Sequence, residues 1–281
     1  MSQISRTWTY STVLIYNQWN QFGTGFLVKR DINETSAKIF LVTNKHVLHM
    51  ETAQRQVATH IVCHMNKKNA GGEVIGIDIN FPLTYEGTAN KNWKEHSNEH
   101  IDILAIDITE MIIAHPDLEK KWVDYSLFIT TEIIQSEDLT IGEDIMVLGY
   151  PSSFKQGNTN FPIVRQGIVA SQLGQIYIDK TLRDAAGNII ERQIPGFLID
   201  GGLIPGSSGS PVVLKPVIGR LKHNTIEMNI PKPYLLGIVA ETRFAPIQLT
   251  ATMHTLGYAD LGLAFDASKI KETIELFFPL H

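Results

Sequence analysis

Residues 200–214 read DGGLIPGSSGSPVVL, and the rest of the chain is organised around this stretch. Its centre, residues 205–211, is a run of small residues before a β-branched segment, so the backbone can turn sharply and leave the Ser208 hydroxyl at the tip. Gly206 and Gly209 permit backbone angles that other residues avoid. The N–H groups of Gly206 and Ser208 could then point the same way, as the stabilisation of an oxyanion requires. The alternative is a flexible Gly/Ser linker, and the apolar runs on both sides argue against it.

Composition places the chain among globular proteins. It has 281 residues, of which 43% are apolar and 19% charged, enough for one large β domain or two smaller ones. The net charge is −5 and no basic block occurs, so we expect no nucleic-acid partner. Cys63 is the only cysteine, which excludes an intrachain disulfide and indicates a reducing compartment. Neither a secretory leader nor a long apolar run is recognisable, so we expect a cytoplasmic protein without membrane contact.

Short strand-like runs separated by turn residues predict an all-β chain. In the first half they are residues 11–16, 23–30, 37–44, 58–65, 75–79 and 102–108. In the second half they are residues 144–151, 162–171, 174–179, 196–202, 210–214, 233–242 and 261–267. Two six-stranded antiparallel Greek-key β-barrels account for this number of strands, and a helical period over residues 267–280 predicts a C-terminal helix that Pro279 ends.

We expect residues 1–125 to form the first barrel and residues 126–281 the second. Residues 112–136 carry charges without alternation, which suits a connection between the barrels. Residues 81–100 lack periodicity and predict a long surface loop, and residues 215–234 predict an extended hairpin or flap. Loops of such length are often functional.

A serine hydroxyl becomes a good nucleophile when an imidazole accepts its proton and a carboxylate orients that imidazole. Among ten histidines, His46 is the best placed, because it follows the apolar run IFLVTN and so lies at the end of a buried strand. Asp102 precedes the apolar run ILAI, which puts its carboxylate at the mouth of another buried strand, and His46 would supply the donor it needs. An ordinary strand-leading aspartate is the alternative. Asp107, five residues on, is expected to be solvated or paired with a lysine.

The remaining histidines predict no metal site. His60 and His64 would share one face of a strand with Cys63 on the other, which is a poor arrangement of ligands. The others occur in surface-like contexts and are expected to be solvated: His49, His96, His100, His115, His223, His254 and His281. We therefore expect no metal and no other cofactor.

The segments TNKHVL, DILAI and GSSGSP occur in the order His, Asp, Ser, and with them the sequence resembles the trypsin-like serine peptidases of the chymotrypsin-type clan. That clan carries T-A-A/G-H, D-I-A-L-like and G-D/N-S-G-G/S-P motifs in the same order. Further similarity is to the bacterial, cysteine-free branch that includes the high-temperature-requirement proteases. These matches are GTGF at 23–26, LGYP at 148–151, GIVAS at 167–171, DGGLIPG at 200–206 and LGLAFDASKI at 261–270. The resemblance covers nearly the whole chain.

The resemblance implies a chymotrypsin-like fold and an intracellular serine endopeptidase. His46 would be the general base, Asp102 the orienting acid and Ser208 the nucleophile, with an oxyanion hole formed by the N–H groups of Gly206 and Ser208. A protein or peptide substrate would lie between the barrels. Two alternatives remain: a catalytically latent, protease-like binding module, and an esterase that uses the same residues.

The resemblance also implies a pocket for the substrate side chain before the scissile bond. In the family this pocket is built from the residue six before the nucleophile, from the strand resembling G-I-V-S-W-G and from a glycine on the last strand. The corresponding positions are Gly202, then Ala240, Glu241 and Thr242, and finally Gly262. Gly202 brings no carboxylate and Thr242 narrows the entrance, so we expect Ala, Val, Leu or similar residues there. An inward-turned Glu241 would instead recruit a basic side chain.

Departures from the family bear on regulation. Ser207 stands where digestive relatives carry the aspartate that pairs with a new N-terminus, so we do not expect activation by N-terminal trimming. The run D-I-L-A carries its alanine one place later than the family does, and we expect no peptide-binding module after the terminal helix. Since residues 81–100 and 215–234 flank the predicted catalytic segments, we expect control by loop order or by a regulatory protein partner.

Overall fold

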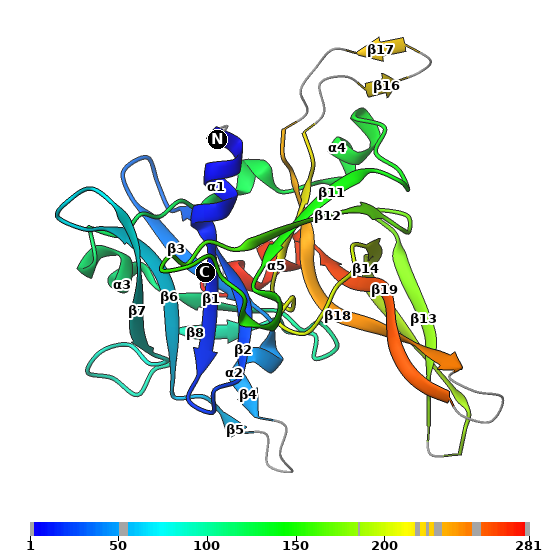
Figure 1. Cartoon of the computed structure of the whole chain (residues 1–281), viewed down its shortest axis with the longest axis horizontal. Coiled ribbons are helices and arrows are strands. Elements are labelled where there is room, and N and C mark those ends of the chain that lie inside the picture. Colours follow the sequence, from blue (N-terminus) through cyan, green and yellow to red (C-terminus); the bar gives the residue numbers. More distant parts are fainter. Residues whose placement is uncertain are drawn as a thin grey trace.

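A computed structural model describes residues 3–50, 56–184, 186–216, 220–222, 225–227, 232–248 and 254–278. The chain forms two large, mainly antiparallel sheets, one on each side of the molecule in Figure 1. The prediction of an all-β fold that ends in a helix is confirmed. No helix in the described ranges is long and apolar enough to cross a lipid bilayer.

The first sheet has the strand order β7-β6-β1-β2-β3-β9-β8, with the short β10 beside β2. Its strands are β1 (Thr12–Asn17), β2 (Phe22–Asp31), β3 (Ala37–Thr43), β6 (His60–Lys68), β7 (Val74–Pro82), β8 (Trp93–Glu95), β9 (Leu104–Asp107) and β10 (Val123–Asp124). A two-stranded sheet of β4 (His49–Met50) and β5 (Gln56–Val57) stands apart from it. Among the described residues no strand pair closes the first sheet, so its closure into a barrel stays a prediction.

The second sheet has the strand order β12-β11-β15-β18-β19-β14-β13. An added pairing of β12 with β14 closes six of these strands into a ring and leaves β13 outside it. The strands are β11 (Asp144–Gly149), β12 (Ile163–Val169), β13 (Ile176–Arg183), β14 (Ile189–Asp200), β15 (Pro211–Leu214), β18 (Leu235–Gln248) and β19 (His254–Asp266). The division into domains at residue 125 stays a prediction.

The central strands of the first sheet are buried on both faces. Leu27, Leu41 and Ile106 lie next to one another across β2, β3 and β9 and belong to the core inside the first sheet. Phe26 and Val42 lie on the other face and belong to a core shared with the second sheet. Burial on both faces explains why these strands read as continuous apolar runs in the sequence.

The C-terminal helix α5 (Ala267–Glu275) lies between the sheets in Figure 1 and contacts strands of both. Ile270 and Ile274 are fully buried in the shared core. The Phe277 ring lies 4.9 Å from that of Phe40 on β3, between ring centroids. The helix begins where the sequence predicts and ends earlier, at Glu275, while Pro279 lies outside the described residues.

Several predicted loops contain structure that the sequence pattern did not indicate. The expected loop 81–100 contains β8, and the expected connection 112–136 contains part of α3 (Thr109–Ala114), the strand β10, a 3-10 turn (Tyr125–Leu127) and α4 (Thr131–Ser136). An N-terminal helix, α1 (Gln3–Ser11), was also not predicted. Within residues 215–234 the structure describes the hairpin of β16 (Arg220–Lys222) and β17 (Thr225–Glu227), and part of that segment lies outside the described residues.

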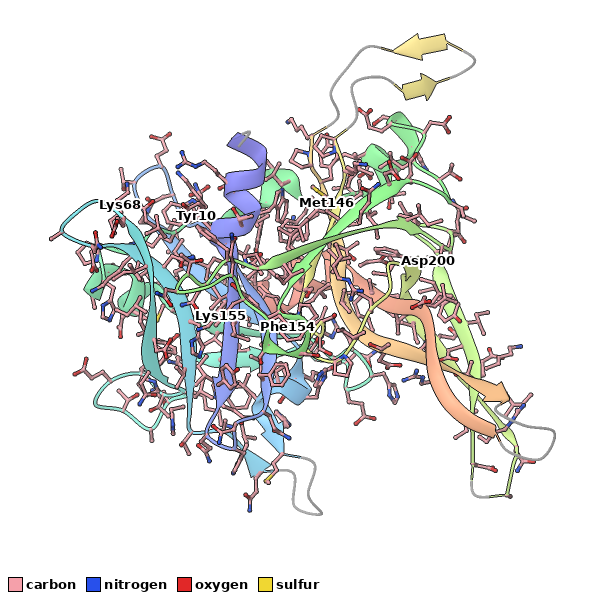
Figure 2. The ribbon with its side chains drawn as sticks, in the orientation of Figure 1. Tyr10, Lys68, Met146, Phe154, Lys155 and Asp200 are labelled. Atoms are coloured by element: carbon pink, nitrogen blue, oxygen red, sulfur yellow. The ribbon has the colours of Figure 1, made fainter. Side chains whose placement is uncertain are left out.

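Polar contacts fix the two sheets to each other. The segment after β11 crosses to the first sheet, where the Tyr150 hydroxyl donates to the Thr12 carbonyl at 3.2 Å; Figure 2 labels Phe154 and Lys155 on this segment. The Asn160 side chain donates to the Met65 carbonyl at 2.7 Å, and its main-chain N–H donates to the Asn66 side chain at 2.7 Å. Because both acceptors lie on β6, the relative position of the sheets is set by hydrogen bonds as well as by the shared core.

Candidate active site

His46 lies in the short helix α2 (Lys45–Leu48), directly after β3. Its Nδ1 is 2.5 Å from Oδ2 of Asp102, and its main-chain N–H donates to Oδ1 of the same carboxylate at 3.2 Å. Asp102 precedes β9, and the pairing of Thr43 with Leu104 brings the two chain segments together. The Asn44 side chain donates to the Asp102 carbonyl at 2.6 Å. One carboxylate therefore fixes both the ring and the backbone of His46.

The electrostatics keep Asp102 ionised. Burial raises the pKa of this carboxyl, but the hydrogen bonds from the His46 ring and from the main-chain N–H groups of His46 and Lys45 outweigh burial and hold the pKa below its usual value. An ionised carboxylate accepts a hydrogen bond from the Nδ1–H group of the ring, so the proton stays on Nδ1 and the lone pair of Nε2 is free to act as a base. The His46 side chain is 43% exposed, so a substrate can reach it.

Ser208 lies in a tight turn between β14 and β15. Gly206 has φ +91° and Gly209 has φ +83°, the left-handed region in which a side chain is strained. A Cβ on Gly209 would also lie 1.8 Å from the Thr24 carbonyl oxygen. The glycines that the sequence indicated are therefore required by both conformation and space.

Thr24 on β2 is a positioning residue that sequence reasoning missed. Its Oγ1 donates to the Gly206 carbonyl at 3.0 Å and accepts from the Tyr150 N–H at 3.1 Å. Its main-chain N–H donates to the Ser208 carbonyl at 2.9 Å, and the Thr43 hydroxyl donates to its carbonyl at 2.7 Å. Thr24 thus connects the Ser208 turn to the strand that leads into His46. The motif GTGF was the available signal, since small residues there allow this close approach.

The N–H groups expected to form the oxyanion hole are free of internal partners. Ser207 and Gly209, which alternate with them, donate to the carbonyls of Ile204 and Val239. Within the described part of the chain, the N–H groups of Gly206 and Ser208 donate to no other residue. Main-chain N–H groups without an internal acceptor are donors of the kind that can stabilise a developing oxyanion.

The Ser208 hydroxyl contacts the main chain of β18. Its Oγ donates to the Ala240 carbonyl oxygen at 3.5 Å, which is a long hydrogen bond. A long bond to a neutral acceptor is easily exchanged for a better one. The structure thus brings His46 and Asp102 into direct contact and joins Ser208 to them through Thr24.

The expected substrate pocket contains two features that the sequence did not predict. A Cβ on Gly262 would lie 2.0 Å from Cδ1 of the buried Leu203, so this leucine packs directly against Gly262. Nη2 of Arg165 lies 3.1 Å from the position of a Cβ on Gly202. Thr242 is paired with Gly262 across β18 and β19. Since Arg165 is on β12, far from Gly202 in sequence, no local pattern could have indicated it.

Glu241 is held by two arginines. Arg192 contacts both of its carboxylate oxygens at 3.1 Å, and Arg243 lies 3.3 Å from one of them. Both arginines also bind Asp179, which is fully buried. Burial raises the pKa of Asp179, and the hydrogen bond from Arg192 and its other bonds outweigh that effect and hold the pKa well below its usual range. The charge of Glu241 is therefore compensated inside the protein.

Residues 23–216 match the family described as the trypsin-like peptidase domain. No curated protein matches the chain. Among solved structures, the active form of the protease Rv3671c from M. tuberculosis is 16% identical, with a TM-score of 0.49, and the alignment covers 99% of this chain and 86% of the other. Its inactive form is 16% identical with a TM-score of 0.46, covering 99% and 93%.

These identities and TM-scores are too low for either structure to bear on the reaction of this chain. The family match is different in kind, because it spans more than half of the chain and contains His46, Asp102 and Ser208. The chain belongs to the family of trypsin-like serine peptidases.

Proposed function

We propose that this peptidase is an endopeptidase that cleaves protein or peptide substrates through an acyl-enzyme formed on Ser208. The observation that carries the proposal is the contact of Asp102 with both Nδ1 and the main-chain N–H of His46, at 2.5 and 3.2 Å. Such a contact fixes the imidazole tautomer that can accept a proton from a serine.

In the proposed reaction, Ser208 Oγ attacks the carbonyl carbon of the scissile bond and its proton passes to Nε2 of His46. The N–H groups of Gly206 and Ser208 donate to the oxyanion. The C–N bond then breaks, and His46 gives its proton to the leaving amine. Water then attacks the acyl-enzyme ester while His46 accepts a proton from that water. His46 returns the proton to Ser208 Oγ as the ester bond breaks, which releases the carboxylic acid product and regenerates Ser208.

For the side chain before the scissile bond we propose an apolar preference, with Gly202, Ala240, Glu241, Thr242 and Gly262 forming the pocket. The fully buried Leu203 packs against Gly262 and makes the surroundings of this glycine apolar. The binding of Glu241 by Arg192 argues against recruitment of a basic side chain, and the Arg165 guanidinium beside Gly202 would repel one.

A latent, protease-like binding module is the second candidate, because Ser208 Oγ donates to Ala240 rather than standing free. A fluorophosphonate probe separates the two. The proposal predicts covalent labelling at Ser208 that disappears in Ser208→Ala. An unlabelled wild-type protein would favour the binding module.

We also propose a cytoplasmic location and control by a regulatory protein partner. The buried Cys63, as the single cysteine, supports a reducing compartment. Subcellular fractionation of the native host tests the location, and recovery in a secreted fraction would contradict it. Purified protein should show weak basal turnover that rises in the presence of the partner.

A further inference from the structure

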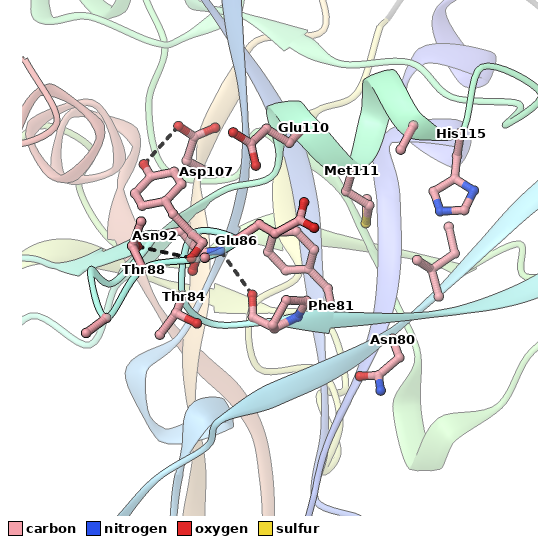
Figure 3. Close-up of a pocket in the computed structure, with 16 residues that line it drawn as sticks. Asn80, Phe81, Thr84, Glu86, Thr88, Asn92, Asp107, Glu110, Met111 and His115 are labelled. Carbon is pink, nitrogen blue, oxygen red and sulfur yellow. Dashed lines mark hydrogen bonds between the residues drawn. The ribbon is translucent and has the colours of Figure 1, made fainter.

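A cavity of about 690 Å³ lies at the far end of β9 from Asp102. Its walls are β7, the loop that follows β7, and α3, as Figure 3 shows. Asp107 lines it, and five residues of nearly extended chain, about 3.3 Å each, separate this aspartate from Asp102. The cavity is therefore distinct from the candidate active site.

The lining is acidic and contains no lysine or arginine. Asp107 is already satisfied, because it accepts from Lys38 at 2.6 Å and from the Tyr85 hydroxyl at 3.1 Å. Glu86 from the loop and Glu110 from α3 are exposed, and within the described residues neither forms an ion pair. In Figure 3 their carboxylates lie between the loop and the helix. Two negative charges in this space remain without a counter-charge.

Asn92 is a second, independent indication of a ligand. Its side chain lines the cavity and the residue is only 2% exposed. Nδ2 donates to the Pro82 carbonyl at 3.0 Å, whereas the buried Oδ1 has no hydrogen-bond partner in the described part of the chain. Buried acceptors without a donor are rare, since they lose their hydrogen bonds to water without compensation.

Apolar residues make up part of the remaining lining, beside polar ones such as Thr84 and His115. Ile79 and Phe81 on β7 and Met111 on α3 are all nearly buried and line the cavity. A ligand that matches these surfaces carries a positive charge and several N–H donors on a hydrocarbon stem. We propose that the cavity binds an organic cation of this kind, an alkylguanidinium or alkylammonium group, from a free amine or from an arginine or lysine side chain of a peptide.

The loop that forms one wall continues to the candidate active site. After β8, His96 lies 3.1 Å from Glu272 on α5, and the carbonyls of Asn98 and Glu99 accept from Lys45 Nζ at 3.1 and 3.5 Å. Lys45 directly precedes His46. The loop that lines the cavity is therefore continuous in sequence, through β8, with the segment that supports the base.

Binding is measured on the Ser208→Ala variant, so that the result does not depend on the proposed function. The probes are agmatine and the capped peptide acetyl-Gly-Arg-Gly-amide, followed by calorimetry and by the ¹³C-methyl signal of Met111. We expect saturable binding that shifts the Met111 signal. The double variant Glu86→Gln/Glu110→Gln should bind about tenfold more weakly or worse, because each carboxylate supplies a charge-assisted hydrogen bond.

Glu132→Gln is the matched control. Glu132 occupies the first turn of α4, as Glu110 does in α3, and both helices have six residues. This variant should bind like the parent. Tighter binding of agmatine would identify a free amine as the source, and tighter binding of the peptide would identify a protein side chain. If neither probe shifts Met111, or if the double variant binds as well as the parent, the proposal is wrong.

Discussion

Asp102 and Asp107 lie at the two ends of one buried strand and have different partners. Burial raises the pKa of both carboxyls, and hydrogen bonds outweigh it and hold both below the usual value. Asp102 is paired with His46, and its side chain is 26% exposed toward the site. Asp107 is paired with Lys38 and is 4% exposed. The pKa shift alone thus does not mark a catalytic group. An imidazole can exchange a proton at neutral pH, whereas a lysine keeps its charge.

The comparison is tested most strongly by Asp102→Asn against Asp107→Asn. Asp102→Asn should lower kcat on a protein substrate by about 10³–10⁴-fold, because the amide no longer selects the active tautomer of His46. Asp107→Asn should keep kcat within about threefold. Steady-state hydrolysis at equal folded concentration is the measurement. Equal losses in the two variants would show that the contact of Asp102 with His46 has no special role.

Thr24 extends the comparison to the positioning of Ser208. Thr24→Val keeps the shape but removes the hydroxyl that binds Gly206 and Tyr150, so kcat should fall about 10- to 100-fold with KM little changed. Thr24→Ser should restore most of the rate. Thr12→Val is the control, since the Thr12 hydroxyl donates to the Trp8 carbonyl at 2.7 Å, within its own segment. Equal effects of Thr24→Val and Thr24→Ser would refute the role of the hydroxyl.

Asp107 should matter for stability instead. Asp107→Asn should lower the free energy of unfolding by about 2 kcal/mol at pH 7, because Lys38 loses its partner. The folded-state pKa of Asp107 lies below the unfolded one, so its contribution is present above about pH 4 and is lost as the pH falls further. Chemical unfolding across pH 3–7 should show that the free energy of unfolding decreases less at low pH in the variant than in the wild type. Identical pH profiles would contradict this.

Asp266 provides the opposite case, an aspartate that precedes α5 without capping it. Burial raises its pKa to about 6. Because the folded pKa exceeds the unfolded one, the charged form is disfavoured in the fold, and stability should fall as the pH rises from about 4 to 6. Asp266→Asn should add about 1 kcal/mol at pH 7. Thermal unfolding of the wild-type protein at about pH 4 and pH 6, and of the wild type and the variant at pH 7, checks this. A variant that is less stable than the wild type at pH 7 would refute it.

The smallest effect is expected at Glu241. Since Arg192 and Arg243 compensate its charge, Glu241→Gln should change the preference for the residue before the scissile bond by less than about threefold. A positional-scanning peptide library measures this. A dominant Arg or Lys preference that Glu241→Gln abolishes would overturn the apolar assignment.

The sequence predicted those parts of the molecule that depend on local pattern. Apolar runs located the main strands, and their ends located His46 and Asp102. Asp107 was expected to be either solvated or paired with a lysine, and the structure shows the second alternative, a pair with Lys38. Three-residue strands such as β8 are too short to show a period. Arg165 beside Gly202 and Arg192 on Glu241 could not be predicted, because these side chains meet across strands that are distant in sequence.

The central claim is that His46, Asp102 and Ser208 act as one unit. Hydrolysis of a protein substrate by Ser208→Ala, His46→Ala and the double variant tests it most directly. Each single variant should lose nearly all activity while its circular dichroism spectrum and melting temperature stay close to those of the wild type, and the double variant should be no less active than either. A Ser208→Ala variant that retains most of the wild-type rate would contradict the assignment of the nucleophile.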